Sequence, residues 1–219
     1  MSDYDTFCTQ IADWANRQDW SQALVASFVS MAEEKLNSRL RIGQMIATTQ
    51  NTVTCGCAPL PSDWLETDLI LMANDATPTG WIPITYKPRD EFFRIPATPY
   101  SGTYVQNFNS TWLTYTIEGL TIYFGGAPDP IEGTLFQMNY FQQVPVFATT
   151  GSSWVYTNYP SLYLFAALMH ADLHAVGEEQ QALLMGAQVD KRIDDLNAAW
   201  LRSKASGSRL KRTRVRSFG

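Results

Sequence analysis

The sequence predicts an α+β protein, in which helical hairpins from the two ends of the chain form one bundle around an antiparallel β-rich insertion. Apolar residues recur every three or four positions near both ends, which is typical of amphipathic helices. Between these regions Pro, Gly and Thr become frequent, and short β-branched and aromatic runs alternate with turn signals. The 219 residues, 45% of them hydrophobic, can bury a sizeable core.

The predicted segments are the first helical hairpin at 1–43, the β domain at 44–150, the second helical hairpin at 151–203 and an extended basic arm at 204–219. Within the first hairpin, one short helix carries an apolar stripe of Tyr4, Phe7, Ile11 and Trp14. A second helix is expected over about 20–41, ending near Gly43. Its apolar side consists of Leu24, Phe28, Met31, Ala32, Leu36 and Leu40, and its polar side of Glu33, Glu34, Lys35 and Arg39.

Seven runs in the middle of the chain have the composition of antiparallel strands. They are Met45–Thr49, Thr52–Cys57, Asp68–Ala73, Trp81–Thr85, Leu113–Ile117, Leu120–Phe124 and Leu135–Gln143. Glu118-Gly119 predicts a tight hairpin, and the prolines within 125–130 end the strand that follows it. The Pro-rich stretch 86–110 predicts a long surface loop.

Helical periodicity returns after residue 151. Thr157-Asn158-Tyr159-Pro160 resembles a capped helix start with a first-turn proline. The apolar stripe of this helix is Leu162, Phe165, Ala166, Met169, Leu173 and Val176, and Gly177 ends it. Glu178 and Glu179 suit the positive end of a last helix. The stripe of this last helix is Met185, Val189, Ile193, Leu196 and Trp200.

The C-terminus differs in charge from the rest of the protein. Residues 202–219 carry seven Lys and Arg and no acid, whereas the preceding residues hold nine Lys and Arg and all 21 Asp and Glu, a formal charge of −12. Three interpretations remain open: the arm binds nucleic acid, docks on an acidic protein surface, or is a solvated tail. Only 17% of residues are charged, so other subunits are expected to cover part of the apolar surface.

The residue patterns do not favour catalysis, a cofactor or a metal site. His170 and His174 share a helix face but lack a third ligand, so we expect them between helices or against a neighbouring subunit, where they could sense pH. Cys8, Cys55 and Cys57 are expected to be reduced thiols, the latter two on or near a strand, which fits a reducing cytosolic compartment. GxSxG, P-loop and GxGxxG motifs are absent. No stretch approaches the roughly 20 apolar residues of a membrane span.

Three segments carry a family resemblance: FVSMAEEKLNSRLR at 28–41, LPSDWL at 60–65 and WVYTNYPSLYLFAAL at 154–168. Their order resembles that of the head-to-tail connector, or adaptor, proteins of tailed bacteriophages, especially short-tailed ones. Those proteins contain three similar segments in the same order along the chain. They are an AE-x-x-(I/L) helix with trailing arginines, an LPxDFL turn and a YPDLYLYGAL-like helix start. Cys55-Gly56-Cys57 and the Pro-rich stretch 88–109 have no counterpart in that pattern.

The resemblance implies a structural virion protein, assembled in the host cytoplasm, that forms a ring of commonly twelve copies between the portal and the tail nozzle or tail tube. Double-stranded DNA would pass through the channel without specific binding, since an acidic wall repels it. In such proteins the C-terminal segment docks on the portal. The portal-binding residues would be Arg209, Leu210, Lys211, Arg212, Thr213, Arg214, Val215, Arg216 and Phe218. The alternative hypotheses are a nucleic-acid-binding protein that uses the basic tail and a hydrolase that uses His170 or His174.

Overall fold

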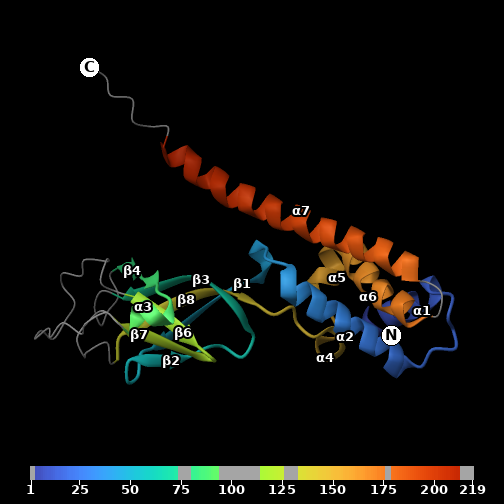
Figure 1. The fold of residues 1–219 in the computed structure, drawn as a ribbon, viewed down its shortest axis with the longest axis horizontal. Helices are drawn as coiled ribbons and strands as arrows, with labels where there is room; N and C mark the ends of the chain where they lie inside the picture. Colours follow the sequence, from blue (N-terminus) through green and yellow to red (C-terminus); the bar gives the residue numbers. More distant parts are fainter. Residues whose placement is uncertain (1–2, 74–79, 94–113, 126–132, 176–178, 213–219) are drawn as a thin grey trace, which may run out of the picture. The chain divides into compact units, whose positions relative to one another are not determined.

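The computed structural model describes residues 3–73, 80–93, 114–125, 133–175 and 179–212, which belong to two compact units (Figure 1). The helical unit comprises residues 1–44 and 144–219, and the β unit comprises residues 45–143. This mixture of helices and antiparallel sheets confirms the predicted α+β class. Within the described ranges, no helix combines the length and hydropathy that crossing a bilayer requires.

The helical unit is built from helices of both chain ends. The N-terminal helices are α1 (Asp3–Trp14) and α2 (Gln22–Arg39), and the long C-terminal helices are α6 (Pro160–His174) and α7 (Glu179–Arg212). The short helices α4 (Phe147–Thr150) and α5 (Trp154–Asn158) precede α6. Because α6 contacts α1, α2, α5 and α7, it is the central helix of the unit.

The predicted stripes of α1 and α2 are confirmed in their centres and wrong at some positions. Phe7, Ile11 and the α2 residues Phe28, Ala32 and Leu36 are buried. Three positions differ from the expectation: Trp14 is 60% exposed, Met31 is 45% exposed, and Glu33, expected on the polar side, is buried.

Helix α6 has no single apolar face. Leu164, Ala167 and Ala171 are buried outside the predicted stripe, whereas Leu173 is 56% exposed. A helix that is covered on several sides loses the one-sided pattern of a surface helix, because most of its positions face a neighbour. Periodicity therefore predicted that α6 exists but not which of its residues are exposed, because α6 is central in the unit.

The start of α6 confirms one predicted signal and corrects another. Pro160 is the first helical residue, as expected from its fixed φ. Thr157 and Asn158 do not cap α6, because they lie inside α5, and the Thr157 hydroxyl donates to the Ser153 carbonyl at 3.1 Å. Tyr159 occupies the N-cap position without a side-chain hydrogen bond.

The β unit consists of two four-stranded sheets with the orders β1-β8-β3-β4 and β2-β7-β6-β5. The strands are β1 (Ile46–Thr52), β2 (Cys57–Pro59), β3 (Trp64–Ala73), β4 (Trp81–Pro83), β5 (Thr85–Tyr86), β6 (Thr114–Glu118), β7 (Thr121–Gly125) and β8 (Leu135–Gln142). All pairs are antiparallel except the short pair β5–β6, which is parallel.

Side chains from both sheets form the core of the β unit. Ile70 and Met138 of the first sheet and Ile122 of the second are fully buried, and the rings of Phe124 and Phe136 lie 5.0 Å apart. The alternation of buried and partly buried residues along most of β8 is therefore the period-two pattern of a strand with one face in a core.

Two tight turns contain residues with positive φ: one joins β6 to β7 in the second sheet, and the other lies between β1 and β2. Gly119, with φ +61°, connects β6 to β7 as predicted, because a left-handed residue matches the twist of a two-residue hairpin. The predicted strand Thr52–Cys57 is wrong: Cys55 and Gly56 have φ +52° and +70° and form a turn closed by reciprocal backbone hydrogen bonds between Thr54 and Cys57. Positive φ at both central residues is typical of a type I′ turn.

The start of the predicted long loop 86–110 is regular rather than irregular. Tyr86 ends β5, and residues 89–92 form the short helix α3 (Arg89–Phe92). The ring of Phe92 packs against Gly125, where a Cβ atom would lie only 2.6 Å from the ring. Residues 94–110 lie outside the described residues.

Candidate assembly surface on the C-terminal helix

Helix α7 packs on the bundle through residues between Ala182 and Trp200. Ala182, Val189 and Ile193 are buried, and Met185, Leu196 and Trp200 are half-buried, so the predicted stripe faces the neighbouring helices. Gly186 allows a close approach to α6, because a Cβ atom there would lie 3.0 Å from the Met169 sulfur. The packed half therefore anchors the helix by ordinary burial of an apolar stripe.

Ion pairs join the same half of α7 to α2. The Oδ1 atom of Asp190 lies 2.7 Å from both Lys35 Nζ and Arg39 Nη1, and Asp194 lies 3.0 Å from Arg39 Nη2. Burial alone would raise the pKa of Asp190, but hydrogen bonds and charges from Lys35 and Arg39 outweigh it and lower this pKa. The three ion pairs are partly exposed and contribute modestly to stability.

Asn197 and Trp200 hold the segment that follows α2. The Asn197 amide accepts from the Arg41 N–H at 2.8 Å and donates to the Arg39 carbonyl at 2.9 Å. The Trp200 ring covers Gly43, where a Cβ atom would lie 2.6 Å from the ring. Gly43 is therefore not the predicted helix stop, since α2 ends at Arg39; it is required by the contact with Trp200. We call Asn197 and Trp200 the α7 clamp.

The five residues that follow the α7 clamp, 201–205, are exposed on the helical unit. Leu201, with 63% of its surface exposed, is followed by residues 202–205, which are all exposed. The helical backbone extends to Arg212 (Figure 1). The expectation of an extended arm from residue 204 therefore differs from the structure over 204–212.

The physical reason for the continued helix lies in the composition of this stretch. Ala, Leu, Arg and Lys are strong helix formers, and the single Gly207 costs only about 1 kcal/mol relative to Ala. Positive charge near a helix C-terminus is also favourable for the helix dipole. Of the predicted portal-binding residues, Arg209, Leu210, Lys211 and Arg212 lie in α7, and Thr213, Arg214, Val215, Arg216 and Phe218 lie outside the described residues.

The histidines lie on α6 near aromatic and charged neighbours. Burial lowers the pKa of His170, and the positive charge of Lys35 acts in the same direction. The ring of His174 lies 5.7 Å from that of Phe28 and 6.4 Å from that of Trp20. In the part of the chain that the structure describes, no group of three or more His, Cys, Asp or Glu side chains could hold a metal ion.

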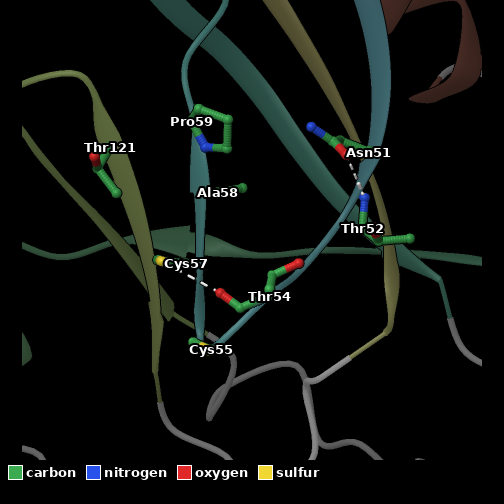
Figure 2. Close-up of a pocket in the computed structure, with 8 residues that line it drawn as sticks. All are labelled: Asn51, Thr52, Thr54, Cys55, Cys57, Ala58, Pro59 and Thr121. Atoms are coloured by element: carbon green, nitrogen blue, oxygen red, sulfur yellow. Dashed lines mark hydrogen bonds between the residues drawn. The ribbon is translucent and has the colours of Figure 1, made fainter.

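The cysteines are free thiols in three different surroundings. Cys8 is buried in α1, and its burial raises the pKa of the thiol. Cys55 is exposed in the hairpin turn, and the Cys57 thiol donates to the Thr54 carbonyl at 3.2 Å. Figure 2 shows both at one end of an open pocket of about 580 Å³, which is also lined by Asn51, Thr52, Thr54, Ala58, Pro59 and Thr121.

The motif at residues 60–65 supports the end of the first sheet. The main-chain carbonyl of Asp63 accepts from the Gln143 N–H at 2.8 Å, and its carboxylate accepts from the Tyr140 hydroxyl at 3.0 Å. Burial, together with this hydrogen bond and the charge of Asp63, raises the pKa of Tyr140 to about 12. The Asp of the LPSDWL motif therefore has a structural role at the end of β8.

Comparison with known proteins identifies the class to which this architecture belongs. The family described as SU10 adaptor protein matches residues 2–216, nearly the whole chain. The chain therefore belongs to the SU10 adaptor protein family, a family of bacteriophage structural adaptors. No curated protein matches the chain. As a phage adaptor, the protein is a component of the virion that interacts with other phage structural proteins.

Proposed function

We propose that this adaptor forms a ring, of twelve copies, that joins the portal to the tail nozzle or tail tube and encloses part of the channel for DNA ejection. The single observation that carries the proposal is α7, which is packed on the bundle as far as Trp200, is exposed over residues 201–205 and continues as a helix to Arg212. An exposed helical segment that leads into a basic terminus suits docking on an acidic partner. In this proposal the docking residues are Arg209 to Arg216 and Phe218, and the protein has no catalytic role.

The outer face of the first sheet supports a second contact, with the tail. It carries the hydrogen-bonded polar pairs Thr48–Asn139 and Gln50–Gln137, beside the partly exposed Leu69 and Leu71 of β3. Strand β1, at the edge of this sheet, contains no charged residue. Edges of soluble sheets are usually protected by charge or proline, so an uncharged edge suits contact with another protein chain.

The experiment compares the full chain with a chain that ends at Lys204, each mixed with purified portal particles. We expect the shortened chain to lose ring formation on portals, since it lacks the basic terminus. A matched control replaces the exposed Lys191 and Arg192 by Ser, which removes charge from the packed half of α7 instead. This control should bind as the full chain does.

Electron microscopy of the complexes gives the number of copies, and sedimentation gives the affinity. Rings that form equally well with the shortened chain would remove the docking proposal. Replacement of Arg209, Lys211, Arg212, Arg214 and Arg216 by Ser should weaken docking, and docking of the unchanged protein should weaken with salt. Tight salt-dependent binding to free DNA, without binding to portals, would instead support the nucleic-acid-binding alternative.

A further inference from the structure

The part of α7 that follows the α7 clamp is a helix before any partner binds. Its twelve residues from Leu201 to Arg212 extend about 18 Å, at about 1.5 Å per residue. Isolated helices shorter than about 12–15 residues are marginal in water. This segment is helical because it continues a helix that is packed on the bundle as far as Trp200, so its conformation depends on the packed part.

The α7 clamp also determines the direction in which this segment leaves the bundle. Asn197 makes two hydrogen bonds to the backbone of residues 39–41, and Trp200 contacts Gly43 one turn later. Both contacts lie within the last four residues before Leu201. A helix held at its base by a bidentate amide and a large ring has little freedom to swing.

We propose that residues 201–212 dock as a preformed, rigid helix that the α7 clamp aims into an acidic groove of the partner. The proposal rests on the proposed function for the identity of that partner, the portal. It adds that the first part of the docking segment is ordered before it binds. Leu201 is the apolar contact at the mouth of the groove, and Arg202 and Lys204, both exposed, provide the first charges. Preorganisation lowers the entropy cost of docking, because the backbone is already ordered.

Substitutions at Ala205 test this inference without removing any charge. Ala205 is exposed, follows the clamp by five residues and lies in the helix interior. Ala205→Pro removes a helical hydrogen bond and breaks the helix, Ala205→Gly weakens it, and Ala205→Ser is the matched control. We expect portal affinity to fall by at least about tenfold for Pro, by less for Gly and hardly at all for Ser.

The outcomes separate this inference from the proposed function. If the chain ending at Lys204 fails to dock and Ala205→Pro docks normally, the terminus binds portals but not as a rigid helix, and the inference is wrong. If Pro weakens docking while Gly equals Ser, the proline ring obstructs the contact, and the inference is again wrong. If the chain ending at Lys204 docks as well as the full chain, the proposed docking function of the terminus is wrong, and the inference that depends on it is wrong as well.

The clamp has its own test. Asn197→Ala removes both hydrogen bonds to residues 39–41 but leaves every residue from Leu201 onward unchanged. We expect weaker docking from a protein that still unfolds cooperatively, with thermal unfolding as the check on folding. Docking equal to that of the unchanged protein would show that the clamp does not aim the helix.

Discussion

Glu33 lies where the helical periodicity of α2 predicts a solvent-facing residue, and the structure buries it with 7% of its surface exposed. Its Oε1 atom accepts hydrogen bonds from the Phe147 N–H at 2.8 Å and from the Tyr163 hydroxyl at 2.6 Å. Burial, this hydrogen bond and the charge of Glu33 raise the pKa of Tyr163 far above its ordinary value. The phenol therefore stays protonated and donates.

We predict that Glu33→Ala lowers the free energy of unfolding by roughly 2–4 kcal/mol, because it leaves the Phe147 N–H and the Tyr163 hydroxyl buried without their acceptor. Glu34→Ala, at the exposed neighbouring position, is the matched control and should change stability by less than about 0.5 kcal/mol. Denaturant unfolding monitored by circular dichroism measures both. Equal effects of the two substitutions would show that the buried hydrogen bonds are unimportant.

At the scale of elements, the returning chain is attached to α2 by two side chains one turn apart. The Glu33 carboxylate accepts from the Phe147 N–H, and the side-chain Oδ1 of Asn37 accepts from the Val144 N–H at 2.7 Å. α2 is thus the element on which the chain re-enters the helical unit. Residues 39–43, where the chain leaves the helical unit before β1, are held by α7.

The burial of α6 also makes the bundle sensitive to acid through His170. Because burial and Lys35 lower the pKa of His170 below 6.5, its ordinary value, the unfolded chain binds more protons than the folded chain as pH falls through this region. Glu34 opposes this shift. The stability that the neutral imidazole contributes is therefore fully present at pH values above the pKa of His170 in the unfolded chain. It decreases as the pH falls below that value.

We predict that the unchanged protein loses stability between about pH 7.5 and 5.5 and that His170→Gln loses less over the same interval. Urea unfolding at several pH values measures the difference. At about pH 8, where the imidazole is neutral in the folded and unfolded chains, the pH slope from this residue should vanish, which serves as the control. Parallel pH profiles of the two proteins would contradict the assignment.

At the scale of the whole molecule, each unit has its own core. The β unit is one uninterrupted stretch, residues 45–143, whereas the helical unit needs both chain ends. The core of the β unit includes Val53, Ile70, Ile122, Phe136 and Met138, each with at most 1% of its surface exposed. A continuous segment with a separate core can fold independently.

We predict that residues 45–143, expressed alone, fold into a monomer that unfolds cooperatively. Residues 1–44 alone should not fold, because α1 and α2 lose the cover of α6. Near-ultraviolet circular dichroism and denaturant titration measure both fragments. A β fragment without a cooperative transition would mean that its core depends on the helical unit.

Sequence reasoning succeeded where the signal is local. Periodicity and turn residues a few positions apart predict the central parts of α1, α2 and α7, the Gly119 hairpin and the strand β8. It failed for Glu33 and Asn197, because polar residues in helices carry no local sign of burial or of a distant partner. It also failed for Cys55-Gly56, where the β-like composition concealed a turn that only the positive φ values reveal.

The amino-acid sequence by itself determined the α+β class, the three-part order of the chain and the basic terminus, because hydrophobic period and charge are properties of neighbouring residues. Only the tertiary structure decided that the terminus begins as a helix, which side of α6 is exposed, and that Asn197 and Trp200 hold residues 39–43. These outcomes depend on contacts between residues such as Arg39 and Asn197, 158 positions apart, which no local pattern encodes.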